Sequence, residues 1–159
     1  MFYNCYSLKR IGFYYLEGSY TYINMSYIFY NCYNLVSIQD INCVQISDAR
    51  KMFYNCSSLE YIDFNPRYIK SNTSMEKIFY NCTKLNEITL SIYTQSSSSY
   101  YIYPSNLSSA FYNCISLIRL KLYYFNTSFV SDFSYMLYNC KKLKHFSFVN
   151  SYFRNNLIC

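Results

Sequence analysis

Glycine and proline are nearly absent from this sequence, with two of each among 159 residues. Glycine usually occupies tight turns because it tolerates positive φ angles, and proline because its φ is fixed. A fold with so little glycine must form its positive-φ turns with another residue, and asparagine is the next most tolerant. Charged residues are also sparse, at 14%, whereas apolar residues make up 52%, which argues against a disordered chain.

Other absences exclude whole classes of protein. No apolar run approaches the ~20 residues of a membrane-spanning helix, so we expect no membrane span. The chain opens at Met1 in sequence that already belongs to a repeat, without the charged and apolar segments of a secretory signal. His145 is the sole histidine and no Cys-x-x-Cys pair exists, so we expect no metal site, no cofactor and no enzyme activity.

A repeated tetrapeptide organises what is present. Phe-Tyr-Asn-Cys or Leu-Tyr-Asn-Cys occurs six times, ending at Cys5, Cys32, Cys56, Cys82, Cys114 and Cys140. These anchor cysteines are 27, 24, 26, 32 and 26 residues apart, and the longest unit contains the run Ser96–Ser99. Leucine-rich repeats have periods of about 20–29 residues, so the spacing predicts six repeats of about 26 residues in a single domain over residues 1–159.

Apolar residues keep fixed offsets from each anchor. Leucine stands three residues after every anchor cysteine, and apolar residues follow six and eight residues after most of them, which predicts a short strand. Asp40 is the exception at the last position, and because Ile41 follows it we expect a bulge in the second strand. Upstream of most anchors, apolar residues at i, i+3 and i+4 predict a short helix.

The asparagine before each anchor cysteine stands where this predicted helix would end in a left-handed residue. The anchor cysteines themselves share one repeat position, so their side chains should stack in parallel rather than converge as a disulfide requires. We therefore predict a ladder of reduced thiols in the core, with Cys43 and Cys159 outside it. The sequence also contains six Asn-x-Ser/Thr sequons, including Asn55 and Asn81, which we interpret as a consequence of composition because a glycan there would compete with the turn.

One unit cannot fold alone. It buries about six large apolar side chains worth about 2 kcal/mol each, whereas ordering its residues costs about 1.5 kcal/mol apiece. Stacking against neighbouring units must supply the difference. The sequence thus predicts an α/β solenoid of the leucine-rich-repeat type: a right-handed coil with a parallel β-sheet on one face and short helices on the other.

The segment from Phe125 to Leu143, FNTSFVSDFSYMLYNCKKL, resembles the BspA-like leucine-rich repeats of surface proteins, whose pattern is similar to F-N-T-S-x-V-x-x-M-S-x-M-F-x-G-C-x-x-L. The resemblance extends over nearly the whole chain, with asparagine in place of the usual glycine. It implies a cell-surface or secreted repeat protein that acts in adhesion, often as one segment of a longer repeat array, and it implies no enzyme.

The outward positions of the predicted strands do not repeat, unlike the core positions, and solenoids present binding surfaces in this way. We predict a site on the strand face formed by Tyr61, Asp63, Glu87, Arg119, Lys121, Lys144 and His145. Its acidic members, with Glu60, are interpreted as a solvated patch rather than as general acids or bases. Its basic members lie in residues 115–159, which carry six Lys/Arg and one Asp/Glu, whereas residues 1–114 carry eight and seven.

These observations predict that the chain is a non-catalytic interaction module that binds a protein or glycan on its strand face. An alternative is a structural spacer, or a segment that assembles end to end through uncapped ends. Nucleic-acid binding has only the C-terminal charge in its favour, because no dense basic run occurs.

Overall fold

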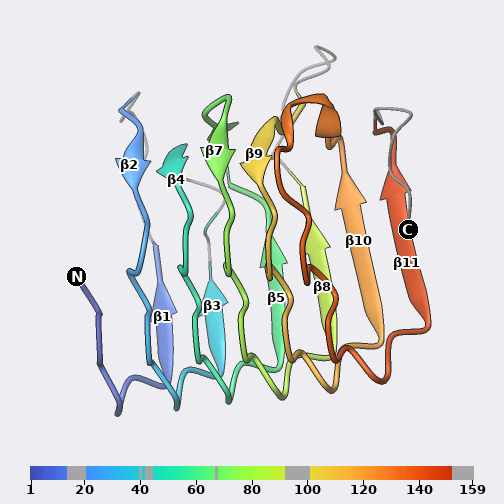
Figure 1. Cartoon of the computed structure of the whole chain (residues 1–159). Helices are drawn as coiled ribbons and strands as arrows, with labels where there is room; N and C mark the ends of the chain where they lie inside the picture. The colour runs from blue at the N-terminus through green and yellow to red at the C-terminus, as the bar shows by residue number, and fades with distance from the viewer. Residues whose placement is uncertain (14–20, 40, 42–44, 67, 92–100, 152–159) are drawn as a thin grey trace.

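The computed structural model describes residues 1–13, 21–39, 41, 45–66, 68–91 and 101–151. The chain winds into a parallel β-solenoid whose successive repeats stack as coils (Figure 1). We number the coils one to six after their anchor cysteines, and from coil two onward each coil begins eight residues before its anchor cysteine. The described elements are β1 (Arg10–Gly12), β2 (Ile23–Asn24), β3 (Ser37–Gln39), β4 (Gln45–Asp48), β5 (Tyr61–Phe64), β6 (Tyr68–Ile69), β7 (Thr73–Ser74), β8 (Glu87–Leu90), β9 (Pro104–Asn106), β10 (Arg119–Tyr123), the 3-10 helix η2 (Thr127–Phe129) and β11 (His145–Val149).

The predicted parallel sheet is confirmed on one face, which we call the strand face. Here β1 pairs with β3, and β5, β8, β10 and β11 form a four-stranded parallel sheet. Side chains alternate as the sequence predicts: in β5, Tyr61 and Asp63 are exposed while Ile62 and Phe64 are buried. Every strand begins five residues after its anchor cysteine, so the outward positions of neighbouring coils lie in register.

The strand-face sheet is divided between β3 and β5. The bulge predicted at Asp40 lies outside the described residues, and the neighbouring Ile41 is buried. A second set of short strands runs along another side of the solenoid, where β2, β4 and β6 form one parallel sheet and β7 pairs with β9 (Figure 1).

The predicted helices are wrong. Between the second set of strands and the anchor cysteines the described backbone forms successive turns, and the described residues contain no α-helix; η2 lies elsewhere. In coil two, the Met25, Tyr27 and Phe29 N–H groups donate to carbonyls of coil three. Of the N–H groups between them, that of Ser26 donates to Asn24 Oδ1 and that of Ile28 to the Met25 carbonyl, which closes a β-turn within the coil. An α-helix would direct all of these groups to its own carbonyls, so bonding between coils replaces it.

Left-handed residues explain why this segment turns instead of coiling into a helix. The asparagine before each anchor cysteine has φ between 58° and 62°, as predicted: Asn4, Asn31, Asn55, Asn81, Asn113 and Asn139. A second positive-φ residue stands four positions earlier in coils two to six: Tyr27, Lys51, Lys77, Ser109 and Tyr135. Two left-handed residues per coil interrupt any right-handed helical run.

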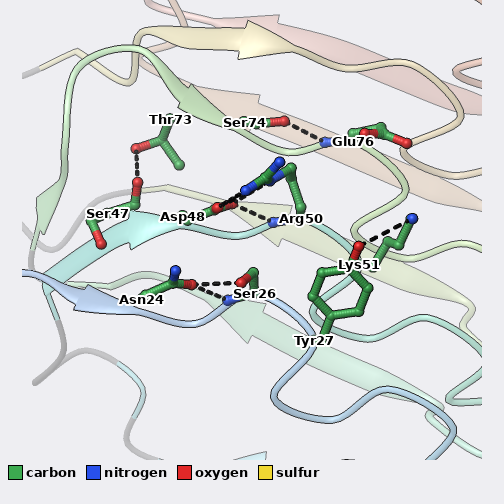
Figure 2. Close-up of polar contacts among 10 residues, drawn as sticks. All are labelled: Asn24, Ser26, Tyr27, Ser47, Asp48, Arg50, Lys51, Thr73, Ser74 and Glu76. Carbon is green, nitrogen blue, oxygen red and sulfur yellow. Dashed lines mark hydrogen bonds and ion pairs between the residues drawn. The ribbon is translucent and has the colours of Figure 1, made fainter.

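Short polar side chains begin these turns. Asn24, Asp48 and Ser74 occupy equivalent positions on successive coils, and each accepts the backbone N–H two residues later (Figure 2). Asp48 also forms an ion pair with Arg50 at 2.6 Å. Such contacts stabilise a turn against helix or strand.

Columns of identical side chains run through the coils. The asparagine amides form a continuous ladder in which each Nδ2 donates to the Oδ1 of the preceding coil, at 2.5 to 3.1 Å. The adjacent tyrosines stack in parallel, with ring centroids 4.6 to 5.0 Å apart. Phe29, Phe53, Phe79 and Phe111 form a fully buried stack beneath them.

The anchor cysteines form the predicted ladder of free thiols. Four are buried, and Cys5 and Cys140 are intermediate. From coil two onward each Sγ donates to the carbonyl of the residue three positions before the preceding anchor, at 3.0 to 3.2 Å. Cys43 and Cys159 lie outside the described residues.

Candidate binding face

Strand register aligns the predicted site residues into two rows across β5, β8, β10 and β11. The first row consists of Tyr61, Glu87, Arg119 and His145. The second row consists of Asp63, Thr89, Lys121 and Ser147. Neighbouring strands lie about 5 Å apart, so members of a row are close enough to contact one partner together.

The two rows change sign across the sheet. Asp63 and Glu87 make the β5–β8 half acidic, and Arg119, Lys121 and His145 place the basic groups on β10 and β11. Arg119 Nη1 lies 3.9 Å from Glu87 Oε2, where the two halves meet. Both side chains are solvent-accessible, so this ion pair contributes little stability. It does join the acidic and basic halves into one surface.

The basic members of the predicted site differ in their exposure and contacts. Arg119 and His145 are neighbours in the first row and are exposed, but Arg119 is engaged by Glu87. Lys121 is intermediate in exposure in the second row. Lys144 is exposed and immediately precedes β11, with its backbone N–H donating to Ile118 at 3.0 Å. The basic groups therefore flank an ion pair and do not form a uniform cationic field.

Tyr61 and Asp63 form the acidic edge of the face. Tyr61 is 54% exposed, and desolvation raises the pKa of its phenol, with further contributions from the charges of Asp63 and Glu87. The phenol therefore remains a hydrogen-bond donor at neutral pH. Partial desolvation also raises the pKa of the Asp63 carboxyl. A ring with an attached donor next to a carboxylate can bind a polar group of a partner.

A hollow that the sequence did not predict lies at a corner of coils three to five. We call it the corner hollow. It has a volume of about 390 Å³ and is lined by Ser71, Asn72, Tyr103 and Phe129. The available sequence signals were weak: a sequon at Asn72 and tyrosines near residue 101. Neither indicates that residues so distant in sequence lie together.

The described residues contain no helix long and apolar enough to cross a membrane. In the same residues, no group of three or more His, Cys, Asp or Glu side chains is arranged to hold a metal ion.

Comparison with known proteins identified one matching family. The model of the BspA-type leucine-rich repeat region matches in six copies, over residues 1–109 and 75–156. Neither the comparison with curated proteins nor that with solved structures returned a match. The matched residues cover nearly the whole chain and coincide with the coils of the solenoid. The chain belongs to the BspA-type leucine-rich repeat family.

Proposed function

We propose that the strand face binds a protein or glycan partner, with a protein favoured, and that the chain acts in adhesion at a cell surface. Repeats of this family suggest a protein-interaction or surface repeat module, which supports this general role. The identity of the partner and the adhesive role belong to the proposal.

The observation that carries the proposal is the mixed charge of two rows on a rigid sheet. A uniformly anionic polymer such as a nucleic acid would meet Asp63 and Glu87 as well as the basic groups, and like charges would oppose its binding. A protein surface can place a basic group against β5 and β8 and an acidic group against β10 and β11. The face therefore fits a protein that itself carries both signs.

The test is a charge reversal on this face. Arg119→Glu combined with Lys121→Glu should slow association with a complementary partner, because rim charges act mainly on the association rate. The assay measures binding of fluorescently labelled chain to intact epithelial cells and to a panel of immobilised extracellular-matrix proteins, at low and at physiological salt.

The matched control is Lys141→Glu with Lys142→Glu, which changes net charge equally at exposed positions before β11. If the control and the strand-face variant lose binding equally, net charge rather than the strand face is responsible. If neither variant changes a binding signal that the native chain shows, the strand face is not the site.

The second candidate, end-to-end assembly, is favoured by the polarity of the amide ladder. Within the described residues, the ladder ends in a donor, Asn4 Nδ2, on coil one and in an acceptor, Asn139 Oδ1, on coil six. These groups are complementary between two copies stacked head to tail. Sedimentation velocity over micromolar concentrations separates the candidates, because reversible growth that survives the charge reversal would indicate assembly through the ends.

A further inference from the structure

The corner hollow is lined by residues of three successive coils. On coil three the turn from Lys70 to Thr73 projects outward, closed by the Thr73 N–H and hydroxyl, which both donate to the Lys70 carbonyl at 3.2 and 2.6 Å. On coil five the projection is η2. The described residues of coil four place Tyr103 immediately before β9, and Tyr103 lines the hollow together with these two walls.

Both walls are held in place before any ligand arrives. Asn72 has a φ of 66°, and its backbone N–H donates to the Tyr103 carbonyl at 2.9 Å. On the other wall, Asn126 Oδ1 accepts the Ser128 N–H at 3.0 Å at the start of η2, and the Ser131 N–H after it donates to Ser105 on coil four at 2.9 Å. A site that is ordered in advance loses less entropy on binding.

The two walls differ in chemistry. Phe129 is 64% exposed, and its ring meets that of Tyr103 at 6.0 Å between centroids with an interplanar angle of 62°. The aromatic surface continues from Tyr103 to Tyr101 and from there to Tyr124, at 6.3 Å in each step. Opposite the rings, Ser71 and Asn72 contribute a hydroxyl and an amide, and none of the described residues that line the hollow is charged.

We propose that the corner hollow binds one unit of a neutral saccharide. A sugar ring presents an apolar C–H surface that packs on Phe129 and Tyr103, and its hydroxyls pair with the Asn72 amide and the Ser71 hydroxyl. The volume lies within the range of small-ligand pockets, about 300–1,000 Å³. The described lining residues are uncharged and provide no ionic partner for a sialic acid or a sulfate, and the neighbouring tyrosines extend the surface for a second sugar unit. This site is separate from the strand face and does not depend on it.

The experiment uses the full chain produced in a bacterial host, so that the sequon at Asn72 carries no glycan. Saturation-transfer NMR and calorimetry are run with chitotriose, lactose and maltotriose, and with sialyllactose as the charged counterpart of lactose. At least one neutral sugar should bind, with saturation on its ring C–H protons. Phe129→Ala should weaken the binding of that sugar at least tenfold, which corresponds to about 1.4 kcal/mol of binding free energy. Asn72→Gly keeps the positive φ and should also weaken binding, whereas Phe129→Tyr should retain it.

Tyr6→Ala is the matched control, because it removes a 50% exposed aromatic ring from coil one, which contributes to neither proposed surface. Its affinity for the sugar should equal that of the native chain. The proposal is overturned if none of the three neutral sugars binds, or if Phe129→Ala binds as the native chain does. It is equally overturned if Tyr6→Ala abolishes binding, or if the hollow takes a proline-rich peptide and no sugar.

Discussion

Asn81 combines two structural tasks that substitution can separate. Its backbone has a φ of 61°. Its Nδ2 donates to Asn55 Oδ1 at 2.9 Å, and its Oδ1 accepts from Asn113 Nδ2 at 2.5 Å. Asn81→Gly removes both amide bonds but tolerates the left-handed backbone. Asn81→Ala removes the same bonds and adds the steric cost of a Cβ at positive φ.

The expected losses follow from these contacts. Two hydrogen bonds at about 1 kcal/mol each give a loss of about 2 kcal/mol for Asn81→Gly, and the greater freedom of glycine in the unfolded chain adds about 0.5–1 kcal/mol. A non-glycine residue pays about 1–2 kcal/mol in the left-handed region. Asn81→Ala should therefore be less stable than Asn81→Gly by about 0.5–1 kcal/mol, the reverse of their usual order in regular secondary structure.

Equilibrium unfolding in urea, followed by far-ultraviolet circular dichroism and tyrosine fluorescence, measures both variants. Asn86 supplies the matched control, because it is exposed and is not among the positive-φ residues, so Asn86→Ala should be at least as stable as Asn86→Gly. Asn139 makes a single ladder bond, so Asn139→Gly should cost less than Asn81→Gly. An alanine variant at position 81 as stable as the glycine variant would refute the backbone argument, and equal losses at 81 and 139 would refute the ladder argument.

Two further predictions concern the core. Leu59→Ala truncates a fully buried side chain and should lower the free energy of unfolding by about 2–5 kcal/mol. Because its coil shares core with both neighbours, hydrogen exchange should accelerate in coils two and four as well, and acceleration confined to coil three would contradict a continuous core. Burial raises the pKa of the Cys56, Cys82 and Cys114 thiols well above 9, so the folded state holds these protons more tightly than the unfolded state. The free energy of unfolding should therefore be unchanged below pH 9 and fall as the pH rises above 9. The fall should be shallower in Cys82→Ala than in the native chain. An identical slope in Cys82→Ala and the native chain would exclude the thiols as the cause.

The features predicted correctly from sequence are those that recur in every repeat. Strand positions, the buried alternate residues, the left-handed asparagines and the thiol ladder each follow from a residue type at a fixed offset from the anchor cysteine. Parallel stacking converts a shared offset into a column, so identifying the period was sufficient to place these side chains. The amide ladder could have been predicted in the same way, because an asparagine carries both a donor and an acceptor on one side chain.

The helices were predicted wrongly because an apolar pattern does not show where backbone hydrogen bonds go. In coil two, Met25, Ile28 and Phe29 are all buried, as an amphipathic helix would require. The same inward positions arise when a chain turns twice through left-handed residues, here Tyr27 and Asn31. The asparagine was visible in the sequence as a left-handed candidate, whereas tyrosine at positive φ was not. Bonding to the next coil then stabilises the turns in place of a helix.

Both proposed binding surfaces lie where the repeats differ from one another. The strand face varies at outward positions that the core does not constrain. The corner hollow lies where Ser71, Tyr103 and Phe129 occupy one repeat position, eleven residues before the next anchor cysteine. Features of the second kind cannot be read from the period, because they depend on which side chain and which local turn each coil has at such a position. They also leave the ladders intact: Phe129 and Lys121 contribute nothing to the asparagine, tyrosine or thiol columns. A chain carrying Phe129→Ala together with Arg119→Glu and Lys121→Glu should therefore fold as a solenoid, and each binding activity should respond only to the substitutions in its own surface.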